Sequence, residues 1–197
     1  MHQTFGSSQE KMSGRTSIST ISAGRLYLGN LAAARDRELL DRLHIGVIIN
    51  AAAEIPPADL PGVVVHHIPL VDSPNQDVVP ELFQLVFDII DDALDRGIPV
   101  LVHCAAGRSR SPLLVVAYLL HAYGLSVDEA LRYVGKSRPE ININLGFLGL
   151  LLREEPGLKS GRVRRGRVLR RFEHPDDLYK RSIACLPTLT RCDAMNF

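Results

Sequence analysis

Short apolar runs alternate along the chain with longer stretches in which apolar residues recur every three or four positions. An apolar run of about four to eight residues between turn residues is typical of a buried strand, and the longer stretches are typical of amphipathic helices. The runs predict strands over residues 25–29, 46–50, 63–68 and 98–102. The longer stretches predict helices after Asn30, between Asp77 and Gly97, and over 110–123, 126–138 and 144–155. Strands that alternate with helices predict an α/β fold, with a central, mainly parallel sheet flanked by helices on both faces.

Capping residues set several of the predicted helix boundaries. Asn30 is suited to cap the first helix, and Ser126 with Glu129 has the spacing of a capping box for the fourth. Gly124 is expected to end the third helix, and Pro156 with the glycine that follows it the last.

The second predicted helix has an acidic candidate cap. Asp77 is suited to this role, Pro80 is tolerated in the first turn, and Gly97 is expected to end the helix. The side chains expected to face inward are Leu82, Leu85, Val86, Ile89, Ile90 and Ala93.

Composition divides the 197 residues into one domain and two tails. Residues 1–19 are polar and rich in serine and glycine, which predicts a flexible N-terminal arm. Residues 20–155 carry all the predicted strands and helices and are long enough to bury one substantial core. Residues 156–197 begin with an abrupt change to basic composition and are expected to form a C-terminal extension.

The basic charge of this extension is concentrated in residues 159–171, which hold seven lysines and arginines and no acidic residue. No aromatic residue is interleaved with them to stack on bases, so a nucleic-acid partner is not expected. The segment is equally suited to contact acidic protein or anionic lipid, but such a run is most often simply solvated.

Other features of the sequence bear on the cellular compartment. No apolar run is long enough to span a bilayer. Three cysteines (Cys104, Cys185 and Cys192) without paired spacing are typical of a reducing intracellular compartment, cytoplasmic or nuclear. The N-terminal segment bears a faint likeness to a mitochondrial presequence, which leaves that destination open.

Residues 98–123 form the most informative stretch of the chain. A predicted strand leads into residues 104–110, called the cysteine loop below, and then into a helix with Pro112 in its first turn. A strand, a tight loop and a helix N-terminus together surround a hollow with backbone N–H groups, which is a site for an anion. In this hollow the N–H groups of Ala105, Ala106, Gly107, Arg108 and Ser109 are candidate phosphate ligands.

The side chains of the cysteine loop predict nucleophilic chemistry on that anion. A helix N-terminus and a nearby cation lower the pKa of a thiol, so Cys104 is expected to be a thiolate. The Arg110 guanidinium presents paired donors suited to two phosphate oxygens, and the Ser111 hydroxyl is placed to stabilise the thiolate when it leaves. A thiolate that faces a bound phosphate suggests attack at phosphorus and a phosphocysteine intermediate.

A cysteine and an arginine separated by five residues have little meaning alone, because the chain has 23 lysines and arginines. The alternative is an unreactive, buried structural cysteine. The order of strand, His-Cys, glycine, Ser-Arg-Ser and helix is the context that favours phosphate chemistry.

The segment His103-Cys-Ala-Ala-Gly-Arg-Ser-Arg-Ser111 closely resembles the signature of the dual-specificity protein phosphatases, members of the cysteine-based tyrosine phosphatase superfamily. Further segments match the family, so the resemblance covers residues 20–155. They are Leu26-Tyr-Leu-Gly29, Ile49-Asn-Ala51, Ile68-Pro-Leu-Val-Asp72 and Arg138-Pro-Glu-Ile-Asn-Ile-Asn-Leu-Gly-Phe147. The order is most similar to the small, atypical members, and 49–51, 54–56 and, loosely, 174–181 resemble a subgroup like the MAP-kinase phosphatases.

The resemblance implies an enzyme that removes phosphate from tyrosine and from serine or threonine in proteins, without a metal ion or other cofactor. Its partners would be phosphorylated proteins, with MAP kinases or components of their pathway as candidates. Two alternatives stay open: a scaffold that binds phosphoproteins with poor turnover, and a phosphatase for lipid or RNA phosphates. Lipid-directed relatives commonly carry lysines in the loop, where this chain has Ala105 and Ala106.

The family also supplies an acid that protonates the leaving oxygen, from the loop after the third strand. Asp72 matches that position, and Asp77 is the competitor with a simpler role as a helix cap. By the same resemblance, His103 and Asn144 support the cysteine loop without acting as acid or base.

Two positions near Asn144 depart from the family pattern, since Ile143 stands where proline is usual and Leu148 where a large aromatic residue is usual. Arg108 is also unusual, because the family commonly has a small or branched apolar residue there. Its side chain is either solvated at the rim or attracts acidic and doubly phosphorylated substrates.

Overall fold

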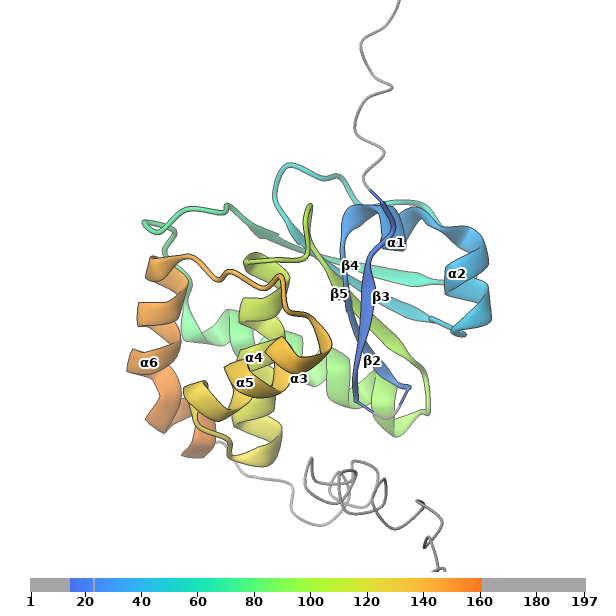
Figure 1. The fold of residues 1–197 in the computed structure, drawn as a ribbon. Coiled ribbons are helices and arrows are strands. Elements are labelled where there is room, and N and C mark those ends of the chain that lie inside the picture. Colours follow the sequence, from blue (N-terminus) through green and yellow to red (C-terminus); the bar gives the residue numbers. More distant parts are fainter. Residues whose placement is uncertain (1–14, 23, 161–197) are drawn as a thin grey trace, which may run out of the picture.

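Helices cover both faces of one five-stranded sheet (Figure 1). The structure is a computed structural model, and it describes residues 15–22 and 24–160. The strands are β1 (Ile18–Ser22), β2 (Leu26–Gly29), β3 (Val47–Ala52), β4 (Val64–Leu70) and β5 (Val100–His103). The helices are α1 (Leu31–Arg35), α2 (Arg37–Arg42), α3 (Pro80–Asp95), α4 (Arg110–Tyr123), α5 (Val127–Ser137) and α6 (Leu145–Ser160).

The strand order is β1-β2-β5-β3-β4, with β5 at the centre. Strands β2, β5, β3 and β4 are parallel to one another, as predicted, whereas β1 pairs with β2 in the antiparallel direction. Strand β1 was not predicted, and its start at Ile18 lies within the range expected for the N-terminal arm. It forms at the sheet edge, where the adjacent Ser19 and Thr20 separate the apolar residues Ile18 and Ile21, so the segment shows neither an apolar run nor a strict alternation.

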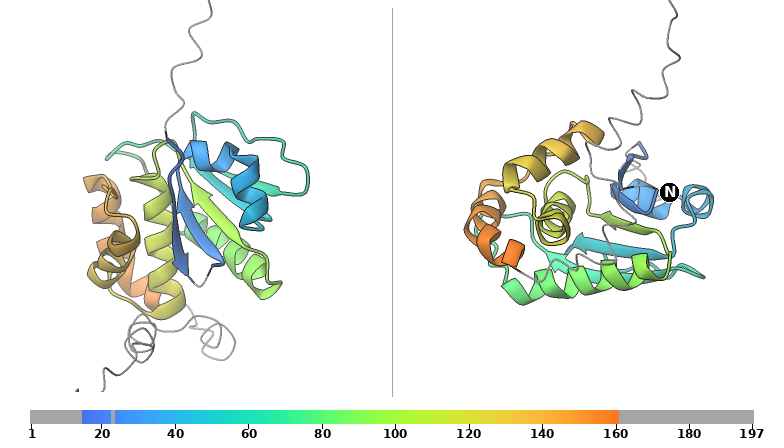
Figure 2. Two further views of the ribbon diagram at one scale, coloured as in Figure 1. Left: turned by 45° about the vertical axis from the view of Figure 1, so that its right-hand side comes forward. Right: turned by 90° about the horizontal axis from the view of Figure 1, so that it is seen from below.

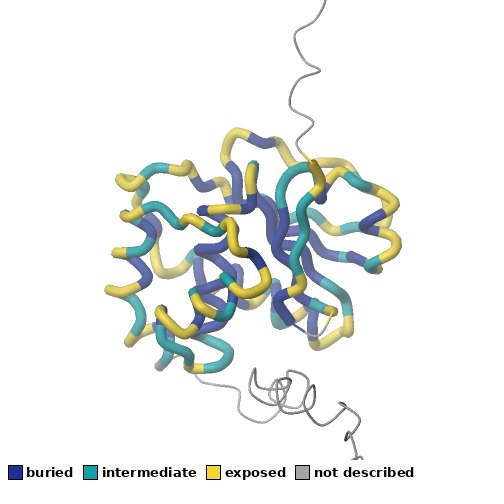
Figure 3. Tube along the Cα trace, viewed as in Figure 1, coloured by how far each residue is buried: buried dark blue, intermediate teal, exposed yellow. Residues whose placement is uncertain are grey.

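Successive side chains of the strands point to opposite faces of the sheet and pack into two separate cores. Leu28, Ile49 and Val102 belong to the large core under α3, α4, α5 and α6, whereas Ile48 and Leu101 face a smaller core under α1 and α2. The end view in Figure 2 shows the two helical layers, and Figure 3 shows the buried strands between them. A parallel sheet is buried on both faces, so its strands appear in the sequence as continuous apolar runs.

Several capping predictions are confirmed. The Asn30 side chain accepts the Ala33 N–H at 3.0 Å, and the capping box of Ser126 and Glu129 is complete. Gly124 caps α4 in the left-handed conformation, with φ of 68°.

Other helix boundaries differ from the prediction. The helix expected after Asn30 is two short helices, because the Asp36 side chain caps α2 after α1 has ended. Asp77 is not the cap of α3: that helix begins after Val79 with no side-chain cap. Leu85 was expected to face inward and is exposed, because it lies on the outer side of α3.

The last helix, α6, runs through Pro156 to Ser160, although the prediction ended it at residue 155. A proline costs a helix one hydrogen bond, but the extra turn buries Leu158 in the large core, and this burial stabilises the longer helix. The basic residues beyond 160 and the rest of the predicted extension lie outside the described residues. Within the described range, no helix is long and apolar enough to cross a membrane.

Candidate active site

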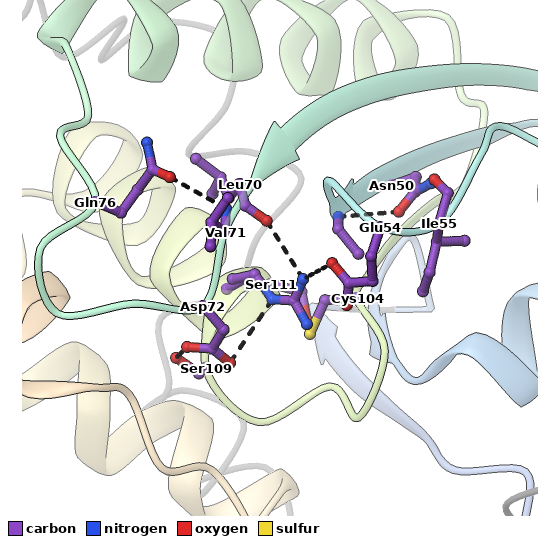
Figure 4. Close-up of polar contacts among 12 residues, drawn as sticks. Asn50, Glu54, Ile55, Leu70, Val71, Asp72, Gln76, Cys104, Ser109 and Ser111 are labelled. Atoms are coloured by element: carbon purple, nitrogen blue, oxygen red, sulfur yellow. Dashed lines mark hydrogen bonds and ion pairs between the residues drawn. The ribbon is translucent and has the colours of Figure 1, made fainter. Parts of the chain in front are cut away.

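The cysteine loop connects the end of β5 to the start of α4 and wraps around the Cys104 thiol (Figure 4). Cys104 is 1% exposed. Its Sγ accepts the Gly107 N–H at 3.2 Å and the Ser111 Oγ–H at 3.3 Å. The loop and the first turn of α4 therefore each direct a hydrogen-bond donor at the sulfur.

These donors change the ionisation of the thiol. Burial raises the pKa of Cys104. Hydrogen bonds from Ser111 and Gly107 and the positive charge of Arg110 together lower it by more than burial raises it, so the pKa lies below that of an ordinary thiol. The thiolate is a much better nucleophile than the thiol.

Gly107 is required by the shape of the loop. Its φ is 69°, in the left-handed region, and a Cβ there would collide with the Gly29 carbonyl and the Arg138 guanidinium. The turn at Gly107 is what brings its N–H to the sulfur.

Arg138 holds the outer side of the cysteine loop. This side chain is 1% exposed, and its guanidinium donates to the carbonyl oxygens of Gly107 at 2.7 Å and Ala106 at 3.2 Å. It also donates to Ser17 Oγ at 3.0 Å, just before β1. Because these carbonyls point outward, the loop N–H groups are free to point inward. Sequence reasoning assigned Arg138 no role, and its place in a segment matching the family was the only signal.

Arg110 is also buried, and its guanidinium donates to two groups of the protein and leaves one buried nitrogen without a partner. Nη1 donates to the Glu54 carboxylate and to the Leu70 carbonyl at 3.3 Å. Nε lies 3.7 Å from Asp72 Oδ2 and is, within residues 15–22 and 24–160, the buried side-chain polar atom without a hydrogen-bond partner. A buried donor without a partner, on a guanidinium whose charge acts on the Cys104 thiol, is suited to a phosphate oxygen.

Neighbouring groups keep the Arg110 guanidinium protonated. Burial lowers the pKa of Arg110, but Glu54, Cys104 and Asp72 raise it overall. In turn, the hydrogen bond from Arg110 lowers the pKa of Glu54. Sequence reasoning gave Glu54 no role either, although the segment that contains it resembled the family.

Asp72 lies in the segment between β4 and α3, two residues after β4 ends. Its Oδ1 accepts the Ser109 Oγ–H at 2.7 Å and an Asn144 Nδ2–H at 2.9 Å. The competitor Asp77 makes no contact with the cysteine loop in the part of the chain that the structure describes.

The remaining predicted residues lie around the loop. His103 is buried, its Nδ1 lies 3.3 Å from the Cys104 carbonyl oxygen, and burial lowers the pKa of His103 to about 4, so it is neutral at neutral pH. The Arg108 side chain is exposed at the rim, where its Nε–H donates to the Glu140 carbonyl at 3.1 Å.

The family model of the dual specificity phosphatase catalytic domain matches residues 26–156, more than half of the chain. The chain belongs to the dual specificity phosphatase family. Mouse dual specificity phosphatase 28 is 35% identical over 138 residues, which cover 70% of this chain and 84% of that protein. Human dual specificity protein phosphatase 16 is 38% identical over 136 residues, which cover 68% of this chain but only 20% of that protein.

The crystal structure of DUSP15 is similar to this structure with a TM-score of 0.69 and 30% sequence identity. The match covers 79% of this chain and 96% of that chain. The family expected from the signature at residues 103–111 is thus confirmed, together with the fold that it implied.

Proposed function

We propose that this dual specificity phosphatase hydrolyses phosphotyrosine and phosphoserine or phosphothreonine in proteins through a phosphocysteine intermediate. The observation that carries the proposal is the buried Cys104 sulfur, whose pKa is lowered by hydrogen bonds from Ser111 and Gly107 and by the charge of Arg110, a buried guanidinium that keeps Nε without a partner. Nothing in this chemistry requires a metal ion, because the guanidinium and the loop N–H groups supply the positive charge.

In the first step, the Cys104 thiolate attacks phosphorus while Arg110 and the backbone N–H groups of residues 105–110 hold the three equatorial oxygens. The bond from phosphorus to the substrate oxygen breaks, and its electron pair stays on that oxygen. Asp72 donates a proton to it, since an alkoxide or phenolate is a poor leaving group.

In the second step, a water molecule attacks the phosphocysteine and gives its proton to the Asp72 carboxylate. The bond between sulfur and phosphorus breaks, and the Ser111 hydroxyl stabilises the departing thiolate by the 3.3 Å hydrogen bond described above. The products are inorganic phosphate and the restored thiolate.

The proposed substrates are phosphorylated proteins as a class. The resemblance of residues 49–51 and 54–56 to the MAP-kinase-phosphatase-like subgroup makes phosphorylated activation segments of MAP kinases the first substrates to try. The absence of lysines at Ala105 and Ala106 favours proteins over phosphoinositides.

Turnover of an aryl phosphate and of singly and doubly phosphorylated peptides tests the proposal. We expect activity that survives a metal chelator and is abolished in Cys104→Ser, because a serine hydroxyl stays protonated at neutral pH. Activity that persists in the serine variant, or that depends on added metal, would contradict the mechanism. A wild-type protein that binds phosphopeptides without turnover would support the scaffold instead.

The assignment of the acid has its own test. Asp72→Ala is expected to lower turnover by about 10²-fold or more, the usual contribution of general acid catalysis. Asp77→Ala is the matched control and should stay close to the wild type, because Asp77 does not cap α3 and does not contact the site. Equal effects of the two substitutions on kcat would remove Asp72 from the mechanism.

A further inference from the structure

The two oxygens of the Asp72 carboxyl group lie in different surroundings. Oδ1 accepts hydrogen bonds from Ser109 Oγ at 2.7 Å and from Asn144 Nδ2 at 2.9 Å. Oδ2 faces the site, 3.7 Å from the unpartnered Arg110 Nε. One oxygen is therefore saturated with donors, and the other points to where the phosphate is proposed to bind.

The direction of the Asn144 amide is set by the start of α6. Asn144 Oδ1 accepts the Phe147 N–H at 2.9 Å, which is the hydrogen bond of a helix cap. The amide nitrogen is then the group left to face Asp72, and it can only donate.

The direction of the Ser109 hydroxyl is set in a similar way. Ser109 Oγ accepts the Asn144 N–H at 3.3 Å, so the hydroxyl hydrogen is directed to Asp72 Oδ1. The two donors thus come from the cysteine loop and from the start of α6, and each is oriented by a hydrogen bond to the Asn144 or Phe147 backbone.

We infer that Ser109 and Asn144 are positioning residues that confine the acidic proton of Asp72 to Oδ2. A proton on Oδ1 would occupy a lone pair that one of the two donors uses and would displace at least one hydrogen bond, whereas a proton on Oδ2 keeps both. The inference rests on the proposed function: as the bond from phosphorus to the leaving oxygen breaks, that oxygen takes the proton from Oδ2 and leaves Asp72 as a carboxylate.

Asn144→Asp tests this role without removing the helix cap. An aspartate caps a helix as well as an asparagine does, but it places a second carboxylate where Asp72 needs a donor. Ser109→Ala removes the other donor and leaves the backbone N–H in place. Asn142→Ala is the matched control, because Asn142 is exposed in the same segment and engages the Arg108 carbonyl through its backbone N–H.

The readout is kcat/KM on a pair of aryl phosphates, one with an unsubstituted phenol and one with a strongly electron-withdrawing phenol as leaving group. Only the first depends strongly on a proton from Asp72. We expect the ratio of the two values, unsubstituted over activated, to fall about tenfold or more in Asn144→Asp and in Ser109→Ala, and to stay at the wild-type value in Asn142→Ala. In the background of Asp72→Ala, neither substitution should lower the ratio further.

Several results would overturn the inference. One is an equal loss on both substrates, which would mean that the two residues act on the cysteine loop rather than on the acid. Another is a further fall of the ratio in the Asp72→Ala background. If Asn144→Asp does not fold, Ser109→Ala decides the question by the same ratio. Absence of turnover that depends on Cys104 in the wild type would refute the proposed function itself, and the inference with it.

Discussion

At the level of single residues, the reactivity of the Cys104 sulfur depends on its burial and on its hydrogen bonds. Burial alone would keep Cys104 protonated, and the Ser111 hydroxyl, the loop N–H groups and Arg110 reverse that effect. Ser111 lies in the first turn of α4, directly after Arg110, so one turn of helix supplies two of these groups.

The rate at which a small neutral reagent such as iodoacetamide alkylates Cys104 should follow this ionisation. We expect half of the maximal rate at a pH below that of an ordinary thiol, because the folded protein lowers the pKa of Cys104. Ser111→Ala should move the midpoint upward by about one to two pH units, since a hydrogen bond to a charged group contributes about 1.5–3 kcal/mol. Mass spectrometry of the peptide that contains Cys104 separates it from Cys185 and Cys192. A midpoint that is the same in both proteins would contradict the role of Ser111.

The contacts of two charged residues, Glu54 and Arg138, could not be predicted from the residues next to them in the chain. Glu54 and Arg138 each lie far along the chain from the cysteine loop, and each makes a direct contact with it or with Arg110. Their types are common on protein surfaces, so nothing in the local pattern distinguished them. Apart from the resemblance of their segments to the family, only the fold, which brings distant segments together, reveals their contacts.

At the scale of elements, the start of α6 is packed directly against the segment that carries Asp72. A Cβ at Gly146, in the first turn of α6, would collide with the backbone of Pro74, including its carbonyl oxygen. With the Asn144 contact to Asp72, this close approach makes the helix terminus the support of the proposed acid.

Gly146→Ala should therefore displace the segment around Pro74 and misplace Asp72. We expect kcat/KM for phenyl phosphate to fall by up to about 10²-fold, since a misplacement of about 1 Å is enough for such a loss. The alkylation midpoint of Cys104 should stay unchanged, because the sulfur and its donors do not touch this contact. Gly149→Ala is the matched control on the same helix, where a Cβ would meet open space. Loss of turnover in the control as well would indicate a general effect on α6.

At the scale of the whole molecule, Arg138 joins parts of the fold that are far apart in sequence. It caps the end of α5, donates to the carbonyls of the cysteine loop, and reaches Ser17 beside the edge strand β1. The edge strand missed in the sequence is thus attached to the site through one buried guanidinium.

Arg138→Met should destabilise the protein by about 3–5 kcal/mol, because it leaves buried acceptors without a donor. Urea unfolding measures this free energy, and phosphate or vanadate inhibition of the surviving folded protein reports on the shape of the cysteine loop. Arg132→Met on the same helix is the control, since its side chain is 67% exposed and its surface pair with Asp128 contributes about 0.5 kcal/mol or less. Similar unfolding free energies for the two variants would show that Arg138 does not hold the fold together.

The parts of this protein that depend on near neighbours could be predicted from the amino-acid sequence. Apolar runs marked the four parallel strands, and the stretch from β5 through Cys104 to α4 indicated the chemistry, because a strand, a tight loop and a helix terminus are local structures. Local patterns failed at Pro156, where burial of Leu158 carries α6 onward, and at Asp77, since α3 begins after Val79 with no side-chain cap. Which distant side chains contact the loop depends on the complete fold. Glu54 on Arg110, Arg138 on the loop carbonyls, and Asn144 on Asp72 are contacts that depend on the order of strands in the sheet, which no single segment encodes.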